Sequence, residues 1–369
     1  MSKIDIQIKQ LEKREYSCSK YNLLDSAEHK NIDNLEKNDY DYYIPFSSKL
    51  VLQLSGSDNN IKICNTLRRV AMNDLPNYAF PAELIKISEN TSVFNNDMMR
   101  LRLSSLPIID TNIDFFFLEP KYWYNVNYAD PKRLRHEQEK QIEISINIYN
   151  NTNKIRNVTT NDIHYYEEGQ EIKKYDTKCP YLIIQLRPSE TFKCSMKATF
   201  GTAERNNIWA CCNAYYDDMT TDDIKETKIE NKNNTITFTI ESFHNNDEYD
   251  LLIKACDYIM KKMDDIMSDL NKKYQEKEIL DTSSLILVLK NEDHTIGELM
   301  NYYFQNHPKI LFSGVTKPDH SIKEIKFKIL CSDDVKNSLE PMFEQMKHIK
   351  KVYTYIKNLL TKMSVRSDV

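Results

Sequence analysis

Two stretches of this chain share one order of apolar and polar positions. Each starts with an apolar strand pattern, passes through a polar loop into an amphipathic helix, and stops at a proline before a second strand. The helices are predicted over residues 57–75 and 293–307. Pro76 and Pro308 end them, because the residue before a proline is pushed out of helical backbone. The two prolines are 232 positions apart, as are two leucines within the helices, so the pattern predicts an internal pseudo-twofold repeat.

Each predicted helix carries an apolar stripe, and we expect the two stripes to pack against each other. Apolar residues spaced three to four apart lie on one side of a helix. A strand–helix–strand unit cannot cover such a stripe alone, so the halves should bury helix against helix. The predicted interface residues are Ile61, Cys64, Leu67, Ala71 and Leu75 in the first helix and Ile296, Leu299, Tyr303 and Phe304 in the second.

Two longer apolar patterns follow, one in each half. Residues 247–274 and 335–363 alternate apolar spacings of four and three, which is typical of helices that pack along their length. Pro341 lies inside the second pattern, so we expect a kink or a late helix start there. The charged stretch 271–278 has no apolar period and is predicted to join the two halves.

Strand patterns are predicted elsewhere in the chain. Alternation at Ile4, Ile6 and Ile8 predicts an edge strand. Between residues 114 and 186 the pattern changes to short strands and polar turns. Residues 115–118 and 142–148 are strand-like there, the second by clean alternation.

Composition sets outer bounds on size and partners. At 369 residues the chain is long enough for about two domains. It is 40% hydrophobic and 28% charged with a net charge of −5, which is typical of an ordinary soluble protein. The negative charge argues weakly against nucleic-acid binding by the whole molecule, although a local basic patch stays open. No apolar run approaches the roughly 18–20 residues of a membrane span, and the first residues contain no signal-peptide core.

Three groups of reactive residues each have a structural and a functional interpretation. The eight cysteines include no Cys-x-x-Cys spacing, so buried or free thiols are favoured over a zinc or redox site. The acidic run at 217–223 is interpreted as a solvated loop rather than a divalent-metal site, because it lacks flanking strands or glycines. The basic run at 132–136 could contact a phosphate backbone, but a solvated loop is favoured because acidic residues interleave just after it.

Catalytic motifs are missing from the sequence. It contains no Asp-x-Asp-x-Asp motif, glycine-rich phosphate loop or nucleophile elbow. Arg68 and Arg69, at the edge of the first apolar stripe, are either solvated or form a docking point for an acidic partner, since guanidinium groups pair bidentately with carboxylates.

Several motifs carry a family resemblance. Asn-Thr-Leu-Arg-Arg at 65–69, Glu-Asn-Thr-Ser at 89–92 and Arg-Leu-Ser-Ser-Leu-Pro-Ile at 102–108 resemble the third-largest-type assembly subunit of multisubunit RNA polymerases. That group includes the archaeal D-like proteins and, more distantly, the bacterial alpha N-terminal domain. The second half resembles the eleventh-type, archaeal L-like proteins at 292–298 and from Pro308 to Pro318. These two types are separate chains in eukaryotes and archaea but are fused in some large nucleocytoplasmic DNA viruses.

The resemblance implies an α+β fold in which two alpha-subunit-like dimerisation units are fused as a pseudo-heterodimer. The third-subunit-like unit would be discontinuous, over 1–113 and 187–275. A mainly β insert domain would span 114–186, and the eleventh-subunit-like unit would span 276–369.

Two departures from the family pattern bear on the insert and on a neighbouring loop. Many relatives carry a cysteine cluster in the insert, whereas this chain has no cysteine between Cys64 and Cys179, so no metal is expected there. Ala203, Glu204 and Asn206 replace a glycine, a lysine and a histidine that are usual in relatives. The contact that this loop makes in relatives is therefore not carried over.

The implied function is a non-catalytic assembly platform of a DNA-directed RNA polymerase, which nucleates binding of the two large catalytic subunits. Implied partners are the largest, second-largest and small tenth-type subunits, with DNA and RNA only indirectly and no membrane, cofactor or metal. The implied large-subunit docking residues are Asn65, Arg68, Arg69, Arg100 and Arg102. The implied location is the viral factory in the host cytoplasm and the virion for a viral protein, and otherwise the nucleus.

Two other functions stay open from the sequence. A stand-alone helical scaffold would be a stable monomer that ignores polymerase subunits. A DNA-binding protein acting through residues 132–136 would bind DNA in isolation with a strong salt dependence.

Overall fold

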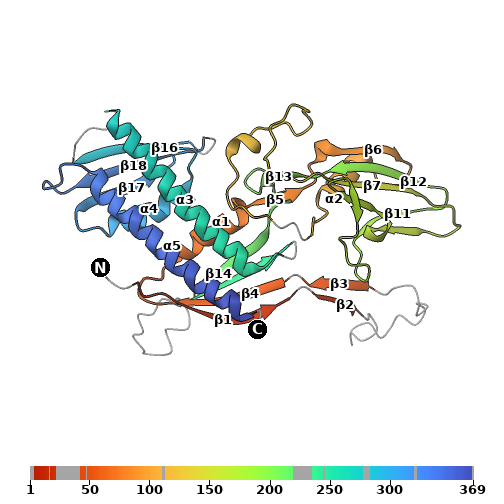
Figure 1. Cartoon of the computed structure of the whole chain (residues 1–369), viewed down its shortest axis with the longest axis horizontal. Coiled ribbons are helices and arrows are strands. Elements are labelled where there is room, and N and C mark those ends of the chain that lie inside the picture. Colours follow the sequence, from red (N-terminus) through yellow and green to blue (C-terminus); the bar gives the residue numbers. More distant parts are fainter. Residues whose placement is uncertain are drawn as a thin grey trace.

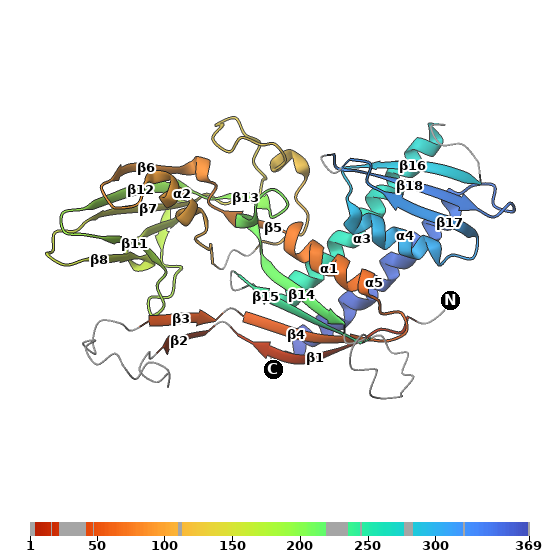
Figure 2. The same cartoon turned by 180° about the vertical axis from the view of Figure 1, so that it is seen from behind.

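The computed structural model describes residues 4–15, 17–21, 42–46, 48–109, 113–218, 235–243, 246–276, 283–319 and 322–367. Within them, five α-helices and several antiparallel sheets form a mixed α+β fold, as the sequence predicts. Figures 1 and 2 show an elongated molecule with its long helices toward one end and a β-rich region at the other.

The first helix–sheet unit places α1 (Ile61–Asn73) on a four-stranded antiparallel sheet. The strand order is β1 (Gln7–Arg14), β4 (Ser48–Ser55), β15 (Ile236–Ser242) and β14 (Cys212–Asp218). An edge strand is thus found as β1, but it begins at Gln7, so of Ile4, Ile6 and Ile8, on which the prediction rested, only Ile8 lies in it. The helix begins after Asn60, whose side chain accepts a hydrogen bond from the amide of Ile63 at 3.0 Å.

The second helix–sheet unit places α4 (His294–Gln305) on a three-stranded antiparallel sheet. Its strand order is β16 (Ser284–Lys290), β18 (Glu324–Cys331) and β17 (Ile310–Thr316). The N-cap is Asp293, whose side chain accepts from the amide of His294 at 2.7 Å. Gly297 lies against this sheet: an added Cβ would be 2.9 Å from the Ile325 side chain.

Two long helices run antiparallel beside these units. They are α3 (Glu248–Gln275) and α5 (Leu339–Ser367). Lys350 pairs with Asp264 at 2.6 Å and Lys357 with Asp257 at 2.6 Å, so the residue numbers rise in one helix as they fall in the other. The helix α5 starts at Leu339 and contains Pro341 in its first turn, which is the predicted late start.

One continuous hydrophobic core joins both units and both long helices. Its members include Leu52 of β4, Val70 of α1, Ile259 of α3, Leu299 of α4 and Met346 of α5, each almost fully buried. Burial of this size, shared among all five elements, binds the two units into a single body. The predicted joint at 271–278 falls at the end of α3, and residues 277–282 lie outside the described part of the chain.

A second core lies in the β-rich region. Its five-stranded antiparallel sheet has the order β10 (Gln170–Ile172), β9 (His164–Glu167), β7 (Ile142–Tyr149), β12 (Thr191–Lys197) and β6 (Ile85–Asn90). The strand predicted at 142–148 is confirmed as β7. A ribbon of β8 (Arg156–Thr159) and β11 (Leu182–Leu186) and the helix α2 (Asn96–Ser104) complete this region.

Two smaller antiparallel ribbons complete the fold. One pairs β5 (Pro76–Ala79) with β13 (Thr199–Thr202), and the other pairs β2 (Ser17–Tyr21) with β3 (Tyr42–Phe46). Gly201 of β13 permits a close approach: an added Cβ would be 2.5 Å from the Trp209 ring.

The strand predicted at residues 115–118 is wrong, because this segment is a loop. Its aromatic side chains serve as anchors in two different cores. Phe115 stacks on His136 at 4.5 Å beside the second core, whereas Phe117 contacts Tyr258 of the first core at 5.7 Å. A run of apolar residues that divides between two cores lacks the cross-strand partner that a β-strand needs.

Candidate subunit interface

The two repeat helices α1 and α4 contact each other across the centre of the first core. Lys62 pairs with Glu298 at 3.0 Å, the Thr66 hydroxyl donates to the Thr295 carbonyl at 3.4 Å, and Arg69 pairs with Asp293 at 3.5 Å. These contacts run in opposite residue directions, so the helices are antiparallel. An antiparallel pair of like helices is the arrangement that a local twofold axis produces.

Most residues predicted for this interface are buried in the shared core. They are Cys64, Leu67, Ala71, Leu75, Ile296, Leu299, Tyr303 and Phe304. Ile61 differs from the prediction, because it is the first residue of α1 and is 42% exposed. The buried face also includes Ile63 and Val70, which the predicted stripe omitted, because two helices and a sheet cover a wider sector of α1 than one partner would.

The predicted docking arginines do not form one cluster. Arg68 donates to Asn65 of the same helix at 3.0 Å, and Arg69 is the residue that pairs with Asp293. Arg100 and Arg102 belong to α2, which packs in the second core. There Arg100 pairs with Asp97 at 2.8 Å, and Arg102 donates to the Leu182 carbonyl at 2.9 Å.

An exposed apolar surface surrounds α2. The sequence-based docking prediction, which named arginines, did not include it. We call it the α2 surface; its residues are Val93, Phe94, Met98, Leu101 and Leu182. Leu101 is 69% exposed although it lies in the middle of a helix. The only sequence signal is weak, namely large apolar residues at positions that do not follow the buried stripe of α2. Exposed apolar groups of this kind mark contact sites for other proteins.

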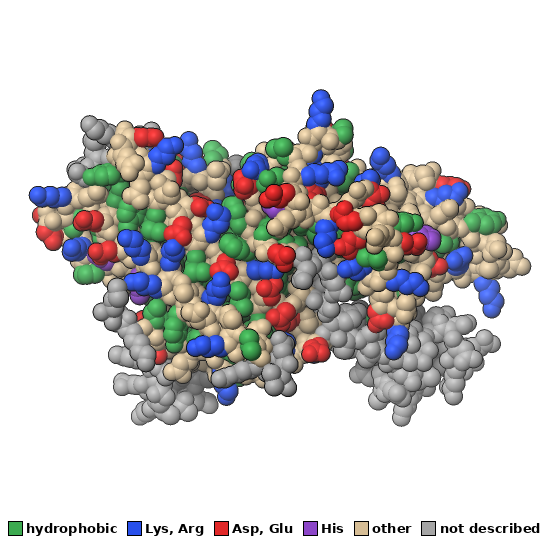
Figure 3. Space-filling model, viewed as in Figure 1, with side chains coloured by type: hydrophobic (Ala, Val, Ile, Leu, Met, Phe, Trp, Pro, Cys, Tyr) green, Lys and Arg blue, Asp and Glu red, His purple; other side chains and the backbone are tan. Residues whose placement is uncertain are grey.

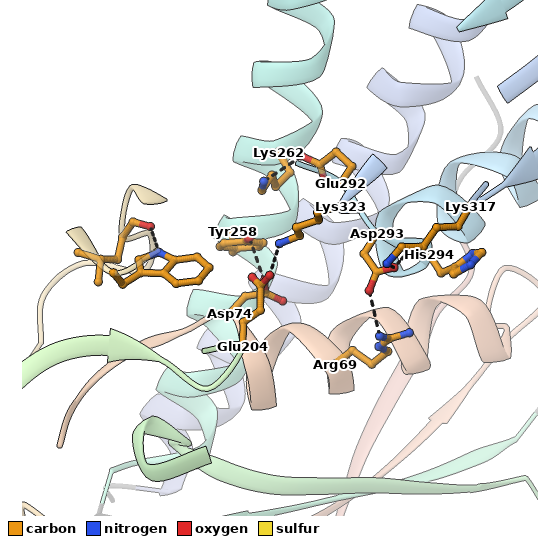
Figure 4. A network of polar contacts seen from close by, with 12 residues as sticks. Arg69, Asp74, Glu204, Tyr258, Lys262, Glu292, Asp293, His294, Lys317 and Lys323 are labelled. Atoms are coloured by element: carbon orange, nitrogen blue, oxygen red, sulfur yellow. Dashed lines mark hydrogen bonds and ion pairs between the residues drawn. The ribbon is translucent and has the colours of Figure 1, made fainter. Parts of the chain in front are cut away.

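A network of charged side chains, here called the polar junction, ties the two units to the insert loop (Figure 4). Its residues are Asp74, Glu204, Tyr258, Lys262, Glu292 and Lys323. The Tyr258 hydroxyl donates to Asp74 at 3.1 Å, Lys262 pairs with Glu292 at 2.9 Å, and Lys323 pairs with Glu204. Glu204 belongs to the first unit and Lys323 to the second, so this pair crosses between them.

Burial shapes the electrostatics of the polar junction. Desolvation, with a smaller contribution from nearby Glu204, raises the pKa of Asp74 to about 6. The adjoining cavity of about 60 Å³ is lined in part by Phe117, Trp123 and Tyr124. Asp74 therefore lies beside a small, partly apolar cavity, where desolvation disfavours its charged form.

The basic run at 132–136 is largely engaged within the molecule. Arg133 and Glu139 form an ion pair at 2.7 Å, with side chains only 6% and 4% exposed. His136 stacks on Phe115 as described above. The guanidinium of Arg133 also lies 5.3 Å from the centre of the Tyr128 ring. Lys132 and Arg135 stay exposed, so the run is held within the molecule at Arg133 and His136 and not along its whole length.

The face of the molecule drawn in Figure 3 does not gather basic side chains in one place. On this face, lysines and arginines of the described residues are interspersed with aspartates and glutamates at both ends of the molecule. Mixed charge of this kind gives little of the focused positive field that nucleic-acid binding uses.

Among the described residues, no group of three or more His, Cys, Asp and Glu side chains is placed to hold a metal ion. Six cysteines are buried free thiols, and Cys179 is disulfide-bonded. Burial raises the pKa of the Cys211 thiol to about 12, which makes it a poor nucleophile. Most of the acidic run at 217–223 lies outside the described residues.

No described helix is long and apolar enough to cross a membrane.

Comparison with known proteins gives three informative similarities. The chain is 24% identical over 336 residues to a protein of Acanthamoeba polyphaga mimivirus that is named as a DNA-directed RNA polymerase subunit, R470; the match covers 85% of this chain and 91% of that protein. It is 30% identical over 91 residues to the RNA polymerase II subunit RPB3 of Schizosaccharomyces pombe, over 25% of this chain and 26% of that subunit.

The third similarity is to the RNA polymerase II subunit rpb3 of Dictyostelium discoideum. It is 23% identical over 166 residues, which is 43% of this chain and 51% of that subunit. No protein-family model matches the sequence. The two RPB3 subunits are thus matched over about a quarter and a half of their length, and the mimivirus protein over nearly all of it. Together with the mixed α+β fold, these similarities make the chain an RPB3-like protein, related in sequence to subunits of DNA-directed RNA polymerases.

Proposed function

We propose that this chain is the non-catalytic assembly platform of a DNA-directed RNA polymerase, with a third-subunit-like and an eleventh-subunit-like unit fused as a pseudo-heterodimer. The supporting observation is the double antiparallel pairing, in which α1 lies against α4 and α3 lies against α5. Two like units related by a twofold axis bring their equivalent helices together in this way.

The proposed division of the chain assigns the two helix–sheet units to different subunit types, and β6, α2 and β12 of the first of them pack with the insert strands in the second core. Residues 1–113 and 187–275 form the third-subunit-like unit, residues 114–186 the insert domain, and residues 276–369 the eleventh-subunit-like unit. The core shared between the two units supports a permanently assembled body rather than two tethered domains.

The partners of this platform are the largest and second-largest polymerase subunits and the small tenth-type subunit. We assign the second-largest subunit to Asn65, Arg68 and the α2 surface, and the largest subunit to the second unit. The α2 surface supports this assignment, because its exposed apolar side chains need a cover. Arg69 takes a smaller part than the sequence suggested, since Asp293 already neutralises it.

Catalysis and cofactor binding are assigned to the large subunits and not to this chain. DNA and RNA are contacted only through the assembled complex. The similarity to the mimivirus protein supports a viral source, and with it a site of action in the host cytoplasm and the virion. The buried Arg133–Glu139 pair takes one of the three Lys and Arg side chains out of the run at 132–136 and so weakens the support for direct DNA binding there.

Co-expression with the two large subunits of the same polymerase tests the proposal. We expect the tagged chain to recover both large subunits in a 1:1:1 complex that extends primed RNA on a DNA template. A chain that remains a free monomer in the presence of both subunits would refute the assembly function and favour a stand-alone scaffold.

A split chain tests the pseudo-heterodimer separately. Fragments 1–275 and 279–369 should form one complex when co-expressed, because each would otherwise expose an apolar helix and a long seam. Two fragments that are each soluble and monodisperse, and that ignore each other at micromolar concentration, would contradict the two-unit architecture.

A further inference from the structure

The sheet of the second unit has an outer face that the described residues leave uncovered. Strand alternation turns Leu287, Phe327 and Ile329 inward, where they are at most 3% exposed. The residues that alternate with them point the other way. Among these, Ile286 is 68% exposed and Leu330 is 40% exposed. In Figure 2 this sheet lies at one end of the molecule, with the helices on its inner side.

Cross-strand register brings the outward side chains together. We call them the C-terminal outer face; its residues are Ile286, Val288, Phe312, Lys326, Lys328 and Leu330. Leu330 of β18 lies directly opposite Phe312 of β17, and Ile286 of β16 lies opposite Lys328. Lysines in the middle of the sheet are therefore flanked by large apolar side chains, within the ~5 Å that separates paired residues.

The equivalent face of the first sheet has a different character. Its outward rows pair Lys49 with Glu241 and Gln53 with Thr237, and between them Val51 with Thr239, which are only 9% and 5% exposed. This face is therefore mainly polar, it pairs a lysine with a glutamate, and its central residues are already buried. The inner faces of the two sheets are alike because both must bury a helix, and the difference is confined to the side that faces away.

Charge on the C-terminal outer face is unbalanced. Lys326 reaches Glu324 only at 3.8 Å, and no described residue forms an ion pair with Lys328. Lys290 lies in the same outward rows, opposite Glu324. Three cations against one carboxylate leave a positive surface, so two copies of this face would repel each other. If a nucleic acid bound here instead, the apolar side chains between the lysines would lie against its charged phosphate backbone without an apolar partner.

We propose that the C-terminal outer face binds an acidic, amphipathic segment of the largest polymerase subunit; this inference rests on the proposed assembly function. The segment lies across the face of the sheet rather than adding a strand to its edge, because the apolar side chains project from the face. Its apolar side covers Ile286, Phe312 and Leu330. Its carboxylates pair with Lys326 and Lys328.

Affinity measurements on the full chain test this assignment, with the co-expressed pair of large subunits as the probe. Lys326→Glu combined with Lys328→Glu should weaken binding at least ~10-fold, and Phe312→Ser combined with Leu330→Ser should do the same. The charge control is Lys9→Glu combined with Lys173→Glu, which changes the net charge equally on exposed residues elsewhere and should stay within about twofold of wild type. In the wild-type complex, amide hydrogen exchange of β16, β17 and β18 should slow.

Each other outcome decides against the proposal in a distinct way. Wild-type affinity in both double variants, with normal melting curves, would overturn the surface assignment while leaving the assembly function intact. Failure of the wild-type chain to bind the large subunits would remove the assembly function and this inference with it. A wild-type dimer in sedimentation that the Phe312/Leu330 variant abolishes would identify a second copy as the occupant. Salt-dependent binding of duplex DNA that the lysine variant loses would identify nucleic acid.

Discussion

The two helix–sheet units bury an apolar helix face in the same way, but the rest of each unit differs. Both begin their helix after a side-chain cap, Asn60 in one and Asp293 in the other, and both press that helix onto an antiparallel sheet. The first unit is interrupted by a second core of its own, and the outer face of its sheet is polar. The second unit is compact, and the outer face of its sheet is partly apolar. The difference shows that the pairing of the units requires apolar inner faces and leaves the outer faces free to differ.

The largest expected effect comes from breaking the contact between the units. Leu299 of α4 is fully buried, so Leu299→Asp would place an unpaired carboxylate in the shared core. We expect a loss of about 3–5 kcal/mol in the free energy of unfolding, measured by urea titration. The matched control is Ile61→Asp, an exposed site in the partner helix, which should cost under ~0.5 kcal/mol. Equal losses at both sites would contradict the helix–helix interface.

Two glycines, one in each unit, sharpen the comparison at a smaller scale. In Gly201→Ala the new Cβ would be 2.5 Å from the Trp209 ring, which is held by a hydrogen bond from its Nε1 to the Thr199 carbonyl at 3.0 Å. Because this ring is held in place and cannot move away, we expect the free energy of unfolding to fall by about 1–3 kcal/mol.

Gly297→Ala is the comparison variant. Its new Cβ would meet the terminal methyl group of Ile325, which can rotate away, and alanine gains about 0.5–1 kcal/mol over glycine inside a helix. The free energy of unfolding of this variant should therefore lie within ~0.5 kcal/mol of the wild-type value. A larger loss at Gly297 than at Gly201 in thermal melts would reverse this account.

The polar junction predicts a pH-dependent difference in stability. The pKa of Asp74 is raised in the folded state to about 6, so the folded chain holds that proton more tightly than the unfolded chain does. Asp74 thus costs stability above about pH 6, and the cost disappears as the pH falls toward ~4. This difference in pKa between the folded and unfolded chain corresponds to about 3 kcal/mol, which the partial exposure of Asp74 reduces.

Asp74→Asn tests this by removing the charge while keeping an acceptor for Tyr258. We expect the variant to be about 1–2 kcal/mol more stable than wild type near pH 8, with the difference lost near pH 4. Urea titrations at a series of pH values measure it. A difference that stays constant across that range would show that the Asp74 charge is not the cause.

The smallest effect on stability is expected at Arg68. Among the described residues, its guanidinium bonds only to Asn65 and Met72 of its own helix. Arg68→Ala should therefore lower the free energy of unfolding by under ~0.5 kcal/mol and yet weaken assembly with the second-largest subunit. Arg69→Ala instead removes the partly exposed pair with Asp293 and should cost up to ~1 kcal/mol. Unchanged recovery of that large polymerase subunit in a pull-down of Arg68→Ala would remove Arg68 from the docking surface.

The sequence by itself determined the elements of the first core. Helical spacing set the stripes of α1 and α4 and the seams of α3 and α5, because a buried helix face must be apolar whatever covers it. The prolines after the short helices predicted their C-terminal ends to within two residues, since α1 ends at Asn73 and α4 at Gln305, and Pro341 predicted the start of α5. The motifs around Asn65 and Arg102 pointed to the polymerase-subunit resemblance in the same way.

The tertiary structure alone decided which side chains meet across long separations. Phe115 and Phe117 resembled a strand but anchor a loop to two cores, because the position of a second core cannot be read from local periodicity. Arg133 resembled a free cation but is buried with Glu139, and Glu204 found its partner in Lys323 of the other unit. Charge pairing and exposure depend on distances between segments far apart in the chain, and those distances exist only after the two units have closed on each other.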